Sequence, residues 1–243
     1  MMLPDEESRR REQDFVRWLD RVKDDAAAVF LLGDIFDFWF EYRYVVPIGS
    51  IRLLGKLAEL TDNGIPVHFF AGNHDQWMRD YLNNELNIQI YHKPAEFELN
   101  GKLFLIGHGH GHDISPEGLK NRAFCFAFQN RLLRMLYASL HPRWGLVCGA
   151  KWSVGRRKRR GIGNPFCGLE SESIYRFAQN KLGEKHYDFF VFGHRHMALD
   201  IRLNENSRYI NTGEWIKAQT YAVFDGEDVV LHTAKAETNI LKI

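Results

Sequence analysis

The chain has 243 residues, of which 45% are hydrophobic, 26% charged and 14% aromatic. These values are typical of a globular protein with a sizeable core, and they exclude a disordered chain. The formal net charge is +1, which gives no case for a nucleic-acid-binding protein. No uncharged apolar run approaches the roughly 20 residues that span a bilayer, and the first residues lack the apolar region of a signal peptide. The sequence therefore predicts a cytoplasmic protein.

The first part of the chain alternates predicted helices and strands. Apolar residues at helical spacing predict helices over residues 5–24 and 51–63. Continuous apolar runs predict buried strands over residues 26–34 and 65–75. This alternation favours an α/β fold in which the strand ends carry the chemistry.

The second part is dominated by strand-like segments after a helical stretch. Helices are expected at residues 120–140 and 169–181, whereas residues 141–166 show no clear period. The simplest division is a single domain of residues 1–243 with a helical, lid-like insertion at about residues 115–170.

Four predicted strands run into glycine and then into residues that can bind a cation. The four segments are GDIFD (33–37), GNHD (72–75), GHGHGHD (107–113) and GHRH (193–196). Strand ends gather at one edge of a parallel or mixed sheet, so ligands far apart in sequence can meet there. A mixture of carboxylate, amide oxygen and imidazole suits Mn²⁺, Fe²⁺, Zn²⁺ or Ni²⁺ better than Ca²⁺. The four segments together predict a metal site.

These motifs, in this order and at these spacings over about residues 28–225, resemble the calcineurin-like metallophosphoesterases. The resemblance implies a four-layer α/β/β/α sandwich and a binuclear centre of divalent transition metals, with Mn²⁺ the expected ion. Asp34 would bridge the two metals. One site would be completed by Asn73, His108 and His194, and the other would be bound by His196.

The same resemblance assigns the remaining motif residues to catalysis. His74 would lie over the scissile phosphate as an acid or transition-state stabiliser, and Asp75 would orient it.

The aromatic segment GDIFDFWFEY and the insertion are similar to those of the UDP-2,3-diacylglucosamine hydrolases. Those enzymes split a diphosphate bond in lipid A synthesis and release UMP and 2,3-diacylglucosamine 1-phosphate. The resemblance implies a lipid-linked nucleotide as substrate.

The residues of the insertion are compatible with such a substrate. Acyl chains could contact Phe124, Phe128 and Leu132. A diphosphate or an anionic membrane surface could contact Arg156, Arg157 and Arg159, since each basic residue near such a surface contributes on the order of 1 kcal/mol. We therefore expect peripheral contact with the cytoplasmic face of the inner membrane. Packing of the helix on the main domain and a solvated basic loop are the plainer alternatives.

The sequence departs from the family pattern in two places. The Asp-X-His motif of the family's first strand is absent, so that strand is expected to be missing and only Asp34 and His196 remain for the second metal. The third motif carries His110 where the family usually has aspartate. Because lost ligands weaken metal binding, the second site is expected to be weak.

Two other functions stay open at this point. One is a phosphatase or phosphodiesterase acting on another substrate. The other is a non-catalytic, degenerate relative that binds a metal or a lipid.

Overall fold

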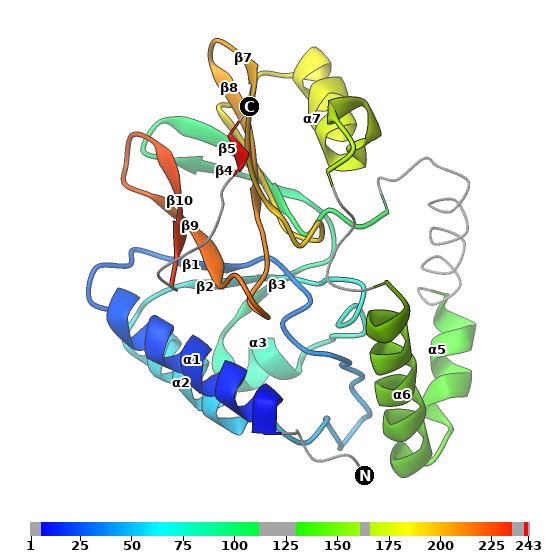
Figure 1. Ribbon diagram of the computed structural model, residues 1–243. Coiled ribbons are helices and arrows are strands. Elements are labelled where there is room, and N and C mark those ends of the chain that lie inside the picture. The colour runs from blue at the N-terminus through cyan, green and yellow to red at the C-terminus, as the bar shows by residue number, and fades with distance from the viewer. Residues whose placement is uncertain (1–5, 112–129, 161–165, 235–240, 243) are drawn as a thin grey trace. The chain divides into compact units, whose positions relative to one another are not determined.

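The computed structural model describes residues 6–111, 130–160, 166–234 and 241–242 (Figure 1). The chain divides into two compact units, the first made of Met1–His92 and Phe128–Lys158, the second of Lys93–Ala127 and Arg159–Ile243. Each unit combines helices with a sheet, which confirms the α/β class predicted from the sequence. Among the described residues, no helix is long and apolar enough to cross a membrane.

The first unit contains a three-stranded parallel sheet in the order β1-β2-β3. Its strands are β1 (Val29–Leu31), β2 (Val67–Phe70) and β3 (Gln89–Tyr91). Its two long helices are α1 (Glu6–Val22) and α2 (Ile51–Asp62), which lie side by side (Figure 1). Leu19, Leu57 and Phe69 are fully buried and join these elements in one hydrophobic core. The helices and strands expected here are confirmed.

Helix α3 (Tyr81–Leu86) and strand β3 were not expected from the sequence. The start of α3 depends on a residue far away in the chain: the buried Glu41 accepts hydrogen bonds from the backbone N–H groups of Asp80 and Tyr81 at 3.0 and 3.2 Å. A helix of six residues is stabilised by such tertiary contacts and not by its own pattern, so local periodicity cannot reveal it.

Two further helices, α5 (Arg131–Ala138) and α6 (Pro142–Arg160), belong mainly to the first unit. Helix α5 is the described part of the helix expected at residues 120–140. Helix α6 was not expected from the sequence, because residues 141–166 show no clear period. It lacks an apolar stripe because glycines occupy the face that packs: a side chain at Gly145 would clash with Tyr42, and one at Gly149 with Phe38.

The second unit is built on a six-stranded mixed sheet in the order β11-β7-β8-β6-β5-β4. The strands are β4 (Ala95–Leu99), β5 (Lys102–Gly107), β6 (Phe189–Phe192), β7 (Ala198–Asn204), β8 (Ser207–Thr212) and β11 (Leu241–Lys242). Strands β5, β6 and β8 are parallel to one another, whereas β4 and β5 form an antiparallel hairpin around Asn100 and Gly101. The 3₁₀ helix η1 (Leu169–Ser171) and helix α7 (Ser173–Glu184) match the expected last helix and contribute Ile174 and Ala178 to the core.

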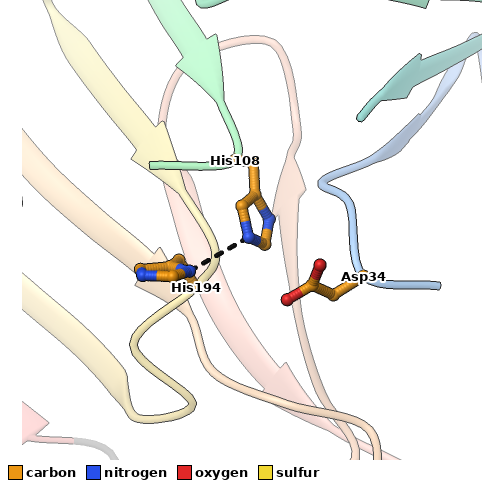
Figure 2. Close-up of side chains that lie close together, drawn as sticks. All are labelled: Asp34, His108 and His194. Carbon is orange, nitrogen blue, oxygen red and sulfur yellow. Dashed lines mark hydrogen bonds between the residues drawn. The ribbon is translucent and has the colours of Figure 1, made fainter. Parts of the chain in front are cut away.

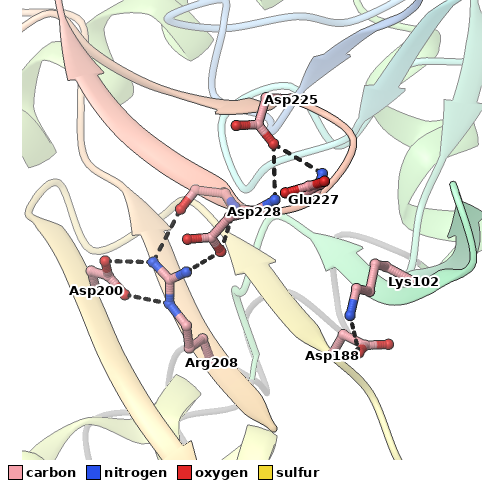
Figure 3. Close-up of polar contacts among 8 residues, drawn as sticks. Lys102, Asp188, Asp200, Arg208, Asp225, Glu227 and Asp228 are labelled. Carbon is pink, nitrogen blue, oxygen red and sulfur yellow. Dashed lines mark hydrogen bonds and ion pairs between the residues drawn. The ribbon is translucent and has the colours of Figure 1, made fainter.

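A second hairpin, β9 (Thr220–Phe224) and β10 (Val229–Thr233), is tied to this sheet by an arginine. Arg208 on β8 forms a bidentate ion pair with Asp200 on β7, at 2.7 and 3.0 Å, and also pairs with Asp228 before β10 (Figure 3). Arg208 therefore joins β7, β8 and the β9–β10 hairpin within the second unit.

Candidate metal and catalytic site

Asp34 follows β1 in a backbone conformation that L-residues rarely adopt, with φ of +55°. Its carboxylate accepts a hydrogen bond from the backbone N–H of His74 at 2.8 Å. Gly72 lies so close that any side chain there would clash with Asp34. The parallel pairing of β1 with β2 thus brings the first two motifs together, as predicted, and the strained backbone is a feature that clusters at functional sites.

Asp75 connects the loops of these two motifs through hydrogen bonds to their backbone. It is completely buried, and its carboxylate accepts backbone hydrogen bonds from Gly72 at 2.6 Å, Ile35 at 2.9 Å and Phe36 at 3.4 Å. Because Gly72 belongs to the second motif and the other two to the first, Asp75 connects both loops through the backbone.

The His74 ring is held by two groups at one nitrogen. Its Nδ1 lies 3.0 Å from the carbonyl oxygen of Asp37 and 2.9 Å from the hydroxyl of Ser153. A carbonyl oxygen only accepts, so the proton of the neutral ring lies on Nδ1, and Nε2 remains for other chemistry.

The second unit brings the third and fourth motifs together at the ends of β5 and β6. Nδ1 of His194 and Nε2 of His108 are 3.1 Å apart, and the ring centroids are 4.9 Å apart (Figure 2). His108 is buried, and His110 lies beside it with its ring centroid at 5.3 Å. Two imidazoles aimed at one another suit a shared cation.

The loop that carries His194 and His196 is strained and is held by an ion pair. These two histidines have φ of +66° and +55°. Between them, Arg195 donates two hydrogen bonds, of 2.6 and 2.5 Å, to the buried carboxylate of Glu172. The hydrogen bond with Glu172 raises the pKa of Arg195 above its usual value, so the guanidinium stays charged.

By residue type, the motifs of each unit fit divalent transition metals. Asp34 offers a carboxylate in the first unit, and His108 and His194 offer two imidazole nitrogens in the second. The Oδ1 atom of Asn73 is buried, and it has no hydrogen-bond partner within the described parts of the chain. A buried polar atom without a partner costs free energy, and a bound cation removes that cost.

The residues expected to bind substrate are described only in part. Leu132 on α5 is 64% exposed. Phe124 and Phe128 lie outside the described residues. Arg156, Arg157 and Arg159 are on the last turns of α6, and their side chains lie outside the described parts.

Two residues of this site, Ser153 and Glu172, were not anticipated from the sequence. Ser153 lies on α6, four residues after Gly149 and eight after Gly145. This regular spacing of small residues could have indicated that Ser153 belongs to a packed helix face. Glu172 carries no such signal.

Comparisons with known proteins agree with the motifs. Residues 10–198 match the family model described as calcineurin-like phosphoesterase. A Porphyromonas gingivalis protein named UDP-2,3-diacylglucosamine hydrolase is 42% identical over 236 residues, covering 91% of this chain and 89% of its own. A Shewanella protein of the same name is 25% identical over 205 residues, covering 84% of this chain and 81% of its own. A solved structure from Streptococcus pneumoniae, described as a predicted phosphoesterase, covers 91% of this chain and 90% of its own at 14% identity, with a TM-score of 0.39.

Proposed function

Because the chain belongs to the calcineurin-like phosphoesterase family, we propose that it hydrolyses UDP-2,3-diacylglucosamine to UMP and 2,3-diacylglucosamine 1-phosphate. The observation that carries this proposal is the near full-length similarity to the Porphyromonas gingivalis relative of that name. Membership of this family makes the chain a hydrolase, and the proposal concerns its substrate, a lipid-linked nucleotide.

We assign the metal ligands within the described motifs. Asp34 would bridge two divalent cations, one of them completed by Asn73, His108 and His194, the other bound by His196. Mn²⁺ is the proposed ion, since carboxylate, amide and imidazole together suit it. Such cations would neutralise charge on the phosphoryl oxygens and lower the pKa of a water molecule. Two observations support this assignment: Oδ1 of Asn73 is buried without a hydrogen-bond partner among the described residues, and Asp34 has a left-handed backbone.

His74 is the proposed catalytic residue. With Nδ1 held by Asp37 and Ser153, its Nε2 would contact a phosphoryl oxygen, stabilising charge there or delivering a proton to the leaving group. Asp75, which is fully buried and bonded to the backbone of both motif loops, would position this residue without touching substrate.

An exposed apolar surface supports contact with a lipid. Leu132, Met135 and Leu136 on α5 are 64%, 62% and 57% exposed, and their spacing places them on one face of the helix. Exposed basic residues begin α5 at Arg131 and follow it along the chain at Arg143. Apolar side chains flanked by positive charge are complementary to an anionic bilayer surface, so we propose peripheral membrane binding through this face.

The experiment for the substrate is release of UMP from UDP-2,3-diacylglucosamine, with Mn²⁺ supplied and with EDTA as the metal-free control. We expect UMP only with Mn²⁺. Hydrolysis of bis(4-nitrophenyl) phosphate without any UMP release would instead favour a phosphodiesterase for another substrate. Full Mn²⁺ loading with neither product would favour a non-catalytic relative.

The experiment for the membrane is sedimentation with vesicles of anionic or zwitterionic lipid. We expect binding to the anionic vesicles only, and loss of that binding for Met135→Glu. Val230→Glu, on an exposed strand of the second unit, is the matched control and should bind as the wild type does. Equal binding by both variants would contradict a docking role for α5.

A further inference from the structure

Helix α6 presents a face of small residues to the loop that follows β1. Gly145, Gly149 and Ser153 are four residues apart and therefore lie on one face of the helix. Side chains at the two glycines would clash with Tyr42 and with the Phe38 ring. The backbone of α6 therefore lies directly against the segment that contains the first motif, within a single compact unit.

Ser153 continues this face to the proposed catalytic histidine. It is completely buried, and its Oγ lies 2.9 Å from Nδ1 of His74. The neighbouring Trp152 places its ring centroid 5.8 Å from that of His74. The Asp37 carbonyl oxygen also contacts this nitrogen, at 3.0 Å from Nδ1.

We propose that Ser153 is a positioning residue for His74: its hydroxyl, carried on the inserted helix α6, fixes the ring plane, while the Asp37 carbonyl keeps the proton on Nδ1. The carbonyl of Asp37 can only accept, so the Nδ1–H group is shared between that oxygen and the Ser153 hydroxyl. Because both partners contact Nδ1, the ring cannot turn about its Cβ–Cγ bond without losing both contacts. Nε2 is then the nitrogen that acts on the substrate.

Because Ser153 is completely buried, its hydroxyl is not positioned to contact the substrate itself. A fully buried hydroxyl bonded to a ring nitrogen acts through that ring, and the insertion thereby contributes to the chemical step as well as to lipid binding. This inference rests on the proposed function, in which His74 is the residue that contacts the phosphoryl group.

A double-mutant cycle of Ser153→Ala and His74→Ala tests the proposal, with bis(4-nitrophenyl) phosphate and Mn²⁺ as the assay. Alanine removes only the hydroxyl and favours the helix, and thermal unfolding checks that each variant folds. We expect Ser153→Ala to lower kcat about 10-fold with KM little changed, at the lower end of the range for loss of a group that orients a ligand or catalyst. In the His74→Ala background the same change should have no further effect. Ser139→Ala, at the exposed end of α5, is the matched control and should leave kcat unchanged.

Two results would overturn the proposal. One is an unchanged kcat for Ser153→Ala; the other is an equal loss in both backgrounds, which would show that Ser153 acts independently of His74. The nitrophenyl substrate keeps the cycle readable even when no UMP is released from the lipid-linked nucleotide. Should the wild type cleave neither substrate, the ¹⁵N spectrum of the His74 ring decides: Ser153→Ala must shift the Nδ1 resonance, because this nitrogen loses one of its two hydrogen-bond partners, and an unchanged spectrum refutes the proposal.

Discussion

The two units hold their motif residues by different means. In the first unit a buried carboxylate, that of Asp75, accepts hydrogen bonds from backbone N–H groups of two loops. In the second unit a buried carboxylate, that of Glu172, forms an ion pair with Arg195 between two candidate ligands. The first arrangement balances a buried charge with dipoles, and the second balances it with an opposite charge. The second should therefore be the more sensitive to loss of one partner, because the remaining charge is left buried.

Removal of Glu172 should give the largest effect on stability. Glu172→Ala leaves the Arg195 guanidinium without its carboxylate, and breaking such a buried pair costs about 3–5 kcal/mol in the free energy of unfolding. Urea denaturation measures it. Glu170→Ala, an exposed neighbour, should stay within about 0.5 kcal/mol of the wild type. A loss below about 1 kcal/mol for Glu172→Ala would show that the pair does not support the second unit.

Replacement of Asp75 should have a smaller effect. Asp75→Asn keeps one acceptor oxygen but turns an amide toward backbone N–H groups, and leaving buried groups unsatisfied costs about 1–3 kcal/mol. The same urea denaturation applies, with the exposed Asp62→Asn as control. If Asp75→Asn proved more destabilising than Glu172→Ala, the expectation that the buried ion pair is the more sensitive of the two arrangements would be wrong.

The close approach of Gly72 to Asp34 should matter for metal binding more than for folding. In Gly72→Ala the new methyl group clashes with the Asp34 carboxylate and backbone, so that this ligand must move. We expect Mn²⁺ affinity to fall about 10–100-fold, the range for disturbed ligand geometry. Calorimetric titration with Mn²⁺ measures it. Gly55→Ala on α2 meets no atom and should leave the affinity unchanged while stabilising the chain by about 0.5–1 kcal/mol.

Mild acid should weaken the first unit slightly. Burial lowers the pKa of His68 on β2 below its usual 6.5, and burial with the charge of Arg134 lowers that of His92. The unfolded chain therefore takes up protons first, so this part of the stability is present above pH 6.5 and is lost as the pH falls below it. Hydrogen exchange in β2 should accelerate between pH 7 and pH 5 after correction for intrinsic rates, and less so in His68→Gln. An identical pH response in the variant would show that His68 does not cause the loss of stability at low pH.

The strands and the motif residues could be predicted because their signals are local. An apolar run ending in glycine marks each of β1, β2, β5 and β6, and parallel pairing then brings His108 to His194. Helix α6 could not be predicted in this way, since its packing face consists of Gly145, Gly149 and Ser153 in place of an apolar stripe.

Glu41 and Glu172, which stabilise the segments around the motifs, could not be predicted from the sequence for a related reason. Glu41 caps α3 from about forty residues away, and Glu172 meets Arg195 across 23 residues. Contacts between residues so far apart in the chain form only in the completed fold, so neither periodicity nor spacing predicts them.

The central claim is that the motif residues bind the metal of a metal-dependent hydrolase. Counting bound Mn²⁺ by electron paramagnetic resonance in the wild type, Asp34→Ala and His194→Ala tests it directly. We predict one tightly held ion in the wild type, a second site that fills only at high Mn²⁺, loss of both ions in Asp34→Ala, and loss of the tight ion in His194→Ala. Wild-type occupancy retained by either variant would contradict the claim.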